Sequence, residues 1–330
     1  MTTGYAGSEA TAHAQGDAAG SVGEILHLLS GGATGSILLA LGDGPLQTKV
    51  LTHRVRGYTP RTIFRYLPRL AQLGLVERDD DPSGPAKVVN TLTPEAGREM
   101  CAVVERFAWA SMTRLPGGQV EPSTWRSLGL LADLWDAGVV DALSRGARSP
   151  TELVQSQHGL TYHQVNRKVG QFKEAGFLRE SKRSRNKQRT YMLTDKARRT
   201  MGLIADIGRW REHCWSNFSG EGLAPEELAT VLRASLLLPN LARHPRRRLR
   251  IRVIGRRHEI DIWVEVDEDG RIRLSEGRPD AVAAEVAADI GSWLSALLGD
   301  EDGLDVGGDE ALARECISGV HDRLWTPSSF

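Results

Sequence analysis

The sequence predicts a mainly α-helical chain that ends in a smaller α+β region. Residues 36–78 and 138–180 align without a gap at a constant offset of 102, with identities such as Gly44/Gly146 and Arg65/Arg167. Apolar side chains recur at helical spacing through both copies and alternate with polar ones between residues 249 and 274. A repeat near 100 residues has the size of a small domain, so we expect two copies of one domain before the α+β region.

These patterns divide the 330 residues into four expected parts. They are a disordered leader (1–20), a first copy (21–115), a second copy (116–219) and an α+β domain (220–330). The leader lacks the basic start and apolar core of a signal peptide. No run of 18 apolar residues occurs, and the three cysteines show neither disulfide nor metal spacing. We therefore expect a cytoplasmic protein with no membrane contact.

Each copy is expected to contain the same elements in the same order. Two apolar helices come first, followed by a turn and a short helix. Thr59 or Thr161 then caps a helix of about fourteen residues, which ends at Gly74 or Gly176 and is called the third helix below because the short helix is not counted. A two-stranded ribbon and a closing helix complete the copy. This order is that of a winged helix-turn-helix, so the predicted fold class is mainly α with α+β: two tandem winged helix-turn-helix domains, then a small domain with an antiparallel sheet covered by helices.

The third helices are the candidate DNA readers. Apolar residues at i, i+4 and i+7 should bury one face, which leaves the opposite face free to enter a major groove. That face is rich in Arg, Gln and Asn, whose side chains can bond base edges in pairs. The candidate DNA-binding residues are Thr59, Arg61, Thr62, Arg65, Tyr66 and Arg69 in the first copy, and Tyr162, His163, Gln164, Asn166, Arg167, Lys168 and Gln171 in the second.

The two wings differ in charge. The second wing has five cations and no anion in nine residues, a composition suited to phosphate contact; they are Lys182, Arg183, Arg185, Lys187 and Arg189. The first wing begins with Asp79-Asp80-Asp81, so we expect it to point away from DNA or to contact protein. Pro68 lies inside the third helix of the first copy and should bend that helix. Net charge follows the same division, with +7 over residues 116–219 and −7 over residues 220–330.

The last hundred residues predict a helix near 223–238, an antiparallel meander of three strands, a helix from about Asp280 to Leu298 and a final helix capped by Asp309. An α+β layer of this kind can enclose an apolar cavity, which makes Trp263, Trp293 and His258 candidate ligand-binding residues. A Trp at helical spacing is more often part of a core, and that alternative stays open for both tryptophans.

These motifs resemble those of the HxlR-type winged-helix regulators of bacteria. The resemblance rests on Tyr58–Ile63, Gly74-Leu75-Val76 and Leu92–Gly97, with Gly176-Phe177-Leu178 and Leu193-Thr194 in the second copy. It covers residues 22–218 and implies a dimer-type DNA-binding transcription regulator, so a tandem copy implies a pseudo-dimer within one chain. The tail is similar, more loosely, to the sterol-carrier-protein-type fold through Asp289–Gly299 and Leu304–Ala313, which implies a sensor for a small hydrophobic ligand.

Catalysis is not expected. The sequence contains no P-loop, G-x-G-x-x-G, H-E-x-x-H, G-x-S-x-G or C-x-x-C motif, and its nine histidines show no ligand spacing. We therefore expect no enzyme, cofactor or metal. The expected partners are double-stranded DNA and a small hydrophobic ligand, with an internal pseudo-dimer and a homodimer both open. The alternative function is a pseudo-dimeric scaffold that binds protein or sequesters a hydrophobic molecule without binding DNA.

Overall fold

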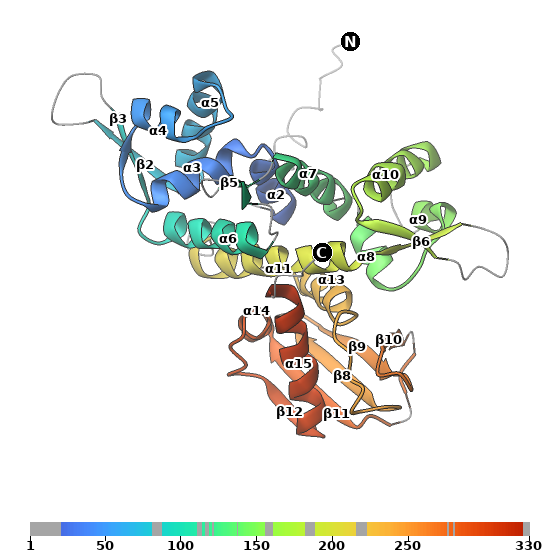
Figure 1. Cartoon of the computed structure of the whole chain (residues 1–330). Coiled ribbons are helices and arrows are strands. Elements are labelled where there is room, and N and C mark those ends of the chain that lie inside the picture. The colour runs from blue at the N-terminus through green and yellow to red at the C-terminus, as the bar shows by residue number, and fades with distance from the viewer. Residues whose placement is uncertain are drawn as a thin grey trace, which may run out of the picture.

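The computed structural model describes residues 21–80, 88–110, 114–115, 119–120, 122–136, 138–155, 161–181, 189–215, 223–275, 277–279 and 281–325. Below, the N-terminal segment is residues 21–115, the middle segment is residues 116–219 and the C-terminal segment is residues 220–330. Figure 1 shows the N-terminal and middle segments side by side, with the sheet of the C-terminal segment on one side of both.

Among its described residues the N-terminal segment contains five helices, a three-stranded sheet and, at its end, the strand β4. In chain order the helices and the strands of the sheet are α2 (Val22–Ser30), α3 (Ala33–Gly42), β1 (Leu46–Gln47), α4 (Thr48–Arg54), α5 (Pro60–Gln72), β2 (Val76–Asp80), β3 (Val88–Leu92) and α6 (Ala96–Ala110). The strands form an antiparallel sheet in the order β1-β3-β2. A short hairpin, β4 (Arg114–Leu115) and β5 (Gln119–Val120), leads into the middle segment.

The middle segment repeats this order of elements. They are α7 (Pro122–Asp136), α8 (Val139–Ser144), α9 (Pro150–Gln155), α10 (Tyr162–Glu174), β6 (Leu178–Ser181), β7 (Thr190–Leu193) and α11 (Asp195–Trp210), which continues into a π-helical turn, η1 (Arg211–Trp215). Even the third strand has a counterpart, because Arg148, which aligns with Leu46, forms a β-bridge to Tyr191. The two segments therefore share an order of helices and strands over the residues that align at the offset of 102.

Capping residues fix the starts of the third helices. Thr59 caps α5, and its hydroxyl accepts a hydrogen bond from the amide of Thr62. Thr161 caps α10 with a capping box, in which the Gln164 side chain also accepts from the amide of Thr161 at 2.8 Å. Both N-caps were predicted from the sequence. Pro68 lies within α5, and the helix continues through it to Gln72.

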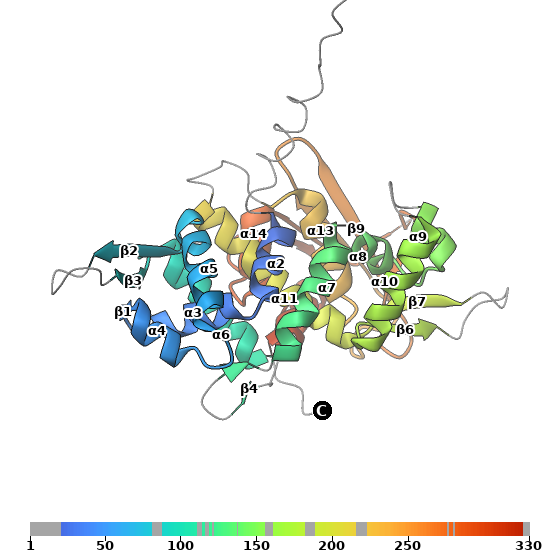
Figure 2. The same ribbon diagram turned by 90° about the horizontal axis from the view of Figure 1, so that it is seen from above.

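Equivalent helices of the two segments pack against each other. Helix α2 contacts α7, and α6 contacts α11. Trp125 of α7 is buried against α3, where a Cβ on Gly35 would overlap its indole ring. On the other side of the contact, the indole nitrogen of Trp210 donates to the carbonyl of Ala96 at 2.9 Å. The two segments therefore pack through helices that hold corresponding places in their order of elements. Figure 2 shows α2 and α7 between α5 and α10.

One buried ion pair joins the two closing helices. Arg106 of α6 donates to both carboxylate oxygens of Asp206 of α11, at 2.7 and 2.6 Å. The Asp206 side chain is 0% exposed, whereas that of Arg106 is 40% exposed. Burial raises the pKa of the Asp206 carboxyl above its usual range, although the Arg106 hydrogen bonds and charge oppose that shift. This contact ties the N-terminal and middle segments together at their cores.

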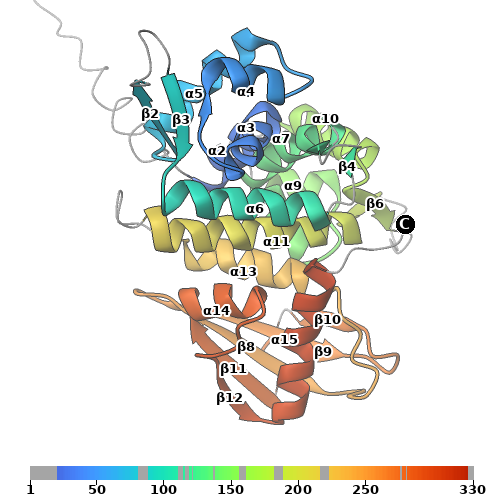
Figure 3. The same ribbon diagram turned by 60° about the vertical axis from the view of Figure 1, so that its left-hand side comes forward.

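The C-terminal segment is a mixed five-stranded sheet with helices on one face. Its elements are α13 (Pro225–Ser235), β8 (Arg248–Ile254), β9 (Glu259–Val266), β10 (Ile272–Ser275), β11 (Ala284–Asp289), α14 (Ile290–Leu297), β12 (Asp305–Gly308) and α15 (Glu310–Trp325). The strand order is β10-β9-β8-β11-β12. Figure 3 shows α6, α11 and α13 stacked in succession toward this sheet, consistent with the contacts of α11 to both neighbours.

Two predictions for this segment were wrong. The expected helix from Asp280 to Leu298 is a strand followed by a helix: β11 spans Ala284–Asp289 and α14 begins only after Asp289, whose side chain accepts from the amide of Ser292. The sheet is also not purely antiparallel, because β11 pairs with β8 in parallel. The alanine-rich stretch reads as helical by spacing, but in the fold both of its edges are occupied by strands that complete its backbone hydrogen bonds.

Within the described ranges, no single helix is both long and apolar enough to cross a membrane. The pair α2 and α3, bent by 86° at its break, reaches the required length and composition. Its apolar side chains Val22, Leu26, Ile37 and Leu38 are each 0% exposed, inside the N-terminal segment.

Candidate nucleic-acid interface

Helix α5 buries one face and exposes the other as predicted. Ile63, Leu67 and Leu70 are each 0% exposed, while Arg61 and Arg65 lie on the exposed face. No acidic residue occurs in this helix. The structure therefore brings two of the predicted DNA-binding arginines to one outward surface, within one turn of each other.

Other candidates on α5 are engaged with the body of the protein. Arg69 forms an ion pair with Glu24 of α2, with 2.9 Å between Nη2 and Oε1. Tyr66 is half-buried above Gly31, where an added Cβ would overlap its hydroxyl, and the Arg65 guanidinium lies 5.1 Å from its ring centroid. Thr62 is partly buried, and its hydroxyl lies 2.9 Å from that of the exposed Thr59. Fewer of the predicted side chains on α5 are therefore free to face a ligand than the sequence predicts.

Helix α10 has the same division. Val165, Val169 and Phe172 are buried, each 1% exposed. The predicted residues that lie exposed are Tyr162, His163, Gln164, Asn166, Arg167 and Gln171. Lys168 is different, since its ammonium lies 3.3 Å from Asp133 of α7 and its side chain is 20% exposed. Lys168 and Tyr66 occupy aligned positions, and both turn toward the segment's own first helix.

The wings are described only in part. Arg189 is exposed, with 4.0 Å between its guanidinium and the carboxylate of Glu180. The other four predicted wing cations, Lys182, Arg183, Arg185 and Lys187, lie outside the described residues. In the N-terminal segment β2 and β3 form an antiparallel ribbon, and Asp79 at its outer end is exposed. Asp81 also lies outside the described residues.

Helices α5 and α10 lie on the same side of the molecule. Figure 1 shows both of them on the side away from the C-terminal sheet, and Figure 2 shows them at opposite ends of the pair α2 and α7. Their buried faces belong to one continuous core that includes Trp125 and Trp210. The two exposed faces therefore belong to helices that pack into one shared core.

The three candidate ligand-binding residues do not converge on one cavity. Trp293 is 0% exposed, and its indole nitrogen donates to the carbonyl of Arg252 at 2.9 Å, beneath the sheet. Trp263 lies on the outward face of β9, with its ring 5.1 Å from the Arg250 guanidinium. His258 is exposed and lies 2.7 Å from Glu226. Trp293 is therefore part of the core, which was the alternative left open for it.

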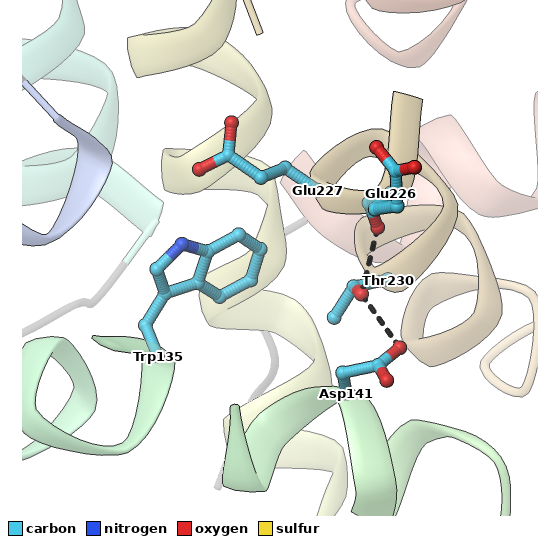
Figure 4. Close-up of a pocket in the computed structure, with 5 residues that line it drawn as sticks. All are labelled: Trp135, Asp141, Glu226, Glu227 and Thr230. Carbon is cyan, nitrogen blue, oxygen red and sulfur yellow. Dashed lines mark hydrogen bonds between the residues drawn. The ribbon is translucent and has the colours of Figure 1, made fainter. Parts of the chain in front are cut away.

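A cavity that sequence reasoning missed lies between the middle and C-terminal segments. It has a volume of about 360 Å³ and is lined by Trp135, Asp141, Glu226, Glu227 and Thr230. Figure 4 shows the Trp135 indole and the Glu227 carboxylate on one side, with Asp141, Thr230 and Glu226 on the other. The Thr230 hydroxyl of α13 is 2.9 Å from Asp141 of α8, and Arg233 donates to the same carboxylate at 3.1 Å. No periodicity in the sequence indicates that these distant residues meet.

The described residues offer neither a cluster of metal ligands nor an exposed thiol. No group of three or more His, Cys, Asp or Glu side chains there could hold a metal ion. Cys101, Cys214 and Cys316 are all buried, and burial is the main cause that raises the pKa of each thiol to about 12. These thiols remain protonated and unreactive at neutral pH.

Comparison with known proteins identifies the N-terminal segment. Residues 28–115 match the family model described as HxlR-like helix-turn-helix. The chain is also similar to the HTH-type transcriptional regulator YodB of Bacillus subtilis (strain 168), with 36% identity over 87 residues, which make up 26% of this chain and 77% of that protein. The match contains α5, which carries the exposed Arg61 and Arg65, together with α3, α4 and the β2–β3 ribbon. The chain therefore belongs to the HxlR-like helix-turn-helix family.

Proposed function

We propose that this protein is a DNA-binding transcription regulator in which α5 and α10 of a single chain read two successive major grooves. The family of the N-terminal segment and the name of its Bacillus relative support DNA-binding regulation. The observation that carries the two-reader proposal is the position of α5 and α10, each with an exposed polar face, on one side of the molecule and in one shared core. Residues 116–219 act, in this proposal, as a second winged-helix reader.

The contacts between equivalent helices support an internal pseudo-dimer. Dimeric helix-turn-helix proteins place two reading helices one helical turn of DNA apart, about 34 Å. In this chain the α2–α7 and α6–α11 contacts replace a subunit interface. Because His163 and Gln164 stand where the first copy has Arg61 and Thr62, one chain should prefer an asymmetric site. Phosphate contact by Arg189 and the neighbouring wing cations would add salt-sensitive affinity.

Base reading is tested by removing one arginine from each face. Arg65→Ala and Arg167→Ala should each weaken binding to a selected duplex by about 1–3 kcal/mol and relax base preference at one position. Arg98→Ala on α6 and Lys173→Ala at the end of α10 are matched controls, because each removes an exposed cation away from the proposed reading face. Fluorescence anisotropy titrations with duplexes that differ at single bases, repeated at several salt concentrations, measure both the loss of affinity and the change in base preference. Equal losses in all four variants, or unchanged base preference, contradict base reading by these helices.

A chain that does not bind heparin or duplex DNA at low salt would instead support the scaffold function. The acidic Asp79 on the first wing and Pro68 in α5 are the features that favour that alternative. A second test is the stoichiometry of the complex, because an internal pseudo-dimer needs one chain for each duplex and a homodimer needs two.

We further propose that a small ligand controls this regulator at the junction of α8 and α13. Asp141 already bonds Thr230 and Arg233 there, so a molecule in the adjacent cavity could change how the C-terminal segment holds the middle segment. Among the described residues, the lining has an indole and three carboxylates but no cation. Each carboxylate has a basic partner outside the lining (Arg233, His258 and Arg211), and the cation-free lining favours a cationic ligand over an anionic one. Tetraphenylphosphonium and tetraphenylborate, equal in shape and opposite in charge, are suitable probes. Binding of the cation that is weakened by Glu227→Gln supports the proposal; equal binding of both ions, or of neither, contradicts it.

A further inference from the structure

Phe64 is an apolar side chain on the polar face of α5. It is 54% exposed and lies between the buried Ile63 and the exposed Arg65. Arg61, one turn earlier, is also exposed. A single exposed hydrophobic residue is ordinary on a protein surface. This one is placed among the cations of the face proposed to enter the groove.

The aligned position on α10 carries a different chemistry. At the offset of 102, Arg65 corresponds to Arg167, whereas Phe64 corresponds to Asn166, which is also exposed. Both helices therefore present the same arginine with a different neighbour on its N-terminal side. Since Ile63 and Val165 are buried at the preceding position, the two neighbours project in equivalent directions from their helices.

The major groove offers a distinct partner to each neighbour. Every A·T pair presents the adenine N7 and N6 groups, which pair with an Asn amide, and the thymine 5-methyl group, which pairs with an apolar side chain. We propose that Phe64 contacts a thymine 5-methyl in one half-site while Asn166 bonds an adenine in the other. The inference rests on the proposed function, in which α5 and α10 both enter major grooves. It makes position 64/166 the residue pair that distinguishes the half-sites.

The test removes single groups from the DNA. A preferred duplex is first selected from random sequence with the full chain. Each thymine is then replaced by deoxyuridine, which lacks only the 5-methyl, and each adenine by 7-deazaadenine, which lacks only the N7 acceptor. Anisotropy titrations compare the wild type with Phe64→Ala, Phe64→Leu and Asn166→Ala. The exposure of both residues makes these variants compatible with folding, which a thermal melt checks.

The wild type should lose about fourfold in affinity at one thymine of the first half-site, the effect of one methyl-sized group leaving an apolar contact. That loss should disappear in Phe64→Ala and persist in Phe64→Leu. Loss at 7-deazaadenine should occur in the second half-site and disappear in Asn166→Ala. Phe64→Asn should make the two halves of a newly selected site more alike.

The outcomes separate this inference from the proposed function. If a sequence is selected but deoxyuridine has the same effect in the wild type and Phe64→Ala, the assignment of Phe64 is wrong while DNA reading stands. If Phe64→Ala lowers the affinity for all duplexes equally, the side chain does not read a base. The same conclusion follows if the variant binds DNA normally and loses affinity only for a protein partner. If no sequence is selected at all, the proposed function fails, and this inference fails with it.

Discussion

Replacing Arg106 with alanine should leave the buried Asp206 carboxylate without its partner and weaken the packing between the N-terminal and middle segments. Asp206 is 0% exposed and would lose both of its hydrogen bonds to Arg106, of 2.7 and 2.6 Å. Removal of one partner from a buried pair costs about 3–5 kcal/mol, because the remaining charge is left unpaired away from water. That is a large fraction of the stability of a typical domain. Equilibrium unfolding in urea, followed by tryptophan fluorescence at pH 7, measures the loss.

The reciprocal change, Asp206→Asn, is the matched control. It leaves Arg106 unpaired, but that side chain is 40% exposed and can be hydrated, so the cost should fall to about 1 kcal/mol. The pH dependence gives a second check. Without Arg106, the folded pKa of Asp206 lies well above its unfolded value, so the folded state takes up the proton first and the penalty shrinks as pH falls from 7 toward 4. Equal costs for the two variants, or an Arg106→Ala penalty that does not change with pH, would refute the reasoning.

Three further predictions concern the cap, the thiols and the shared core. Thr161→Ala should cost about 1 kcal/mol in urea unfolding, because the hydroxyl no longer accepts from the amide of Gln164 or donates to its side chain, and Thr161→Ser should recover most of it. With pKa values near 12, the thiols of Cys101, Cys214 and Cys316 should react with a disulfide reagent at pH 7.5 only in denaturant; fast labelling of the folded chain would contradict their burial. Trp125→Ala should cost about 3–5 kcal/mol, and a loss below 1 kcal/mol in a thermal melt would show that α7 does not pack on α3 as described.

The helical part of the fold was predictable because its signals are local. N-caps at Thr59 and Thr161 and left-handed glycines at Gly74 and Gly176, with φ of 66° and 76°, define the ends of the third helices. Apolar spacing then gives the buried face directly. The internal repeat adds a check that a single copy lacks, since each element is read twice.

The C-terminal segment was harder because its decisive contacts are distant in sequence. Residues 284–289 carry alanines at spacings that suit a helix, and only the neighbouring strands β8 and β12 make them a strand. The candidate DNA-binding residues were also hard to predict, because their partners are distant in sequence. Arg69 and Lys168 look like groove-facing cations until their acidic partners, Glu24 and Asp133, are located on other helices. Phe64 was passed over because a sequence pattern assigns apolar residues to the core.

The measurement that tests the central claim most directly is a hydroxyl-radical footprint of the complex between one chain and one selected duplex, with the stoichiometry fixed by native mass spectrometry. We expect one chain per duplex and two protected patches about one helical turn apart, unequal in sequence, with Arg167→Ala removing contacts from one patch only. A single protected patch, or two chains bound for every pair of patches, would contradict the proposal that one chain carries both readers.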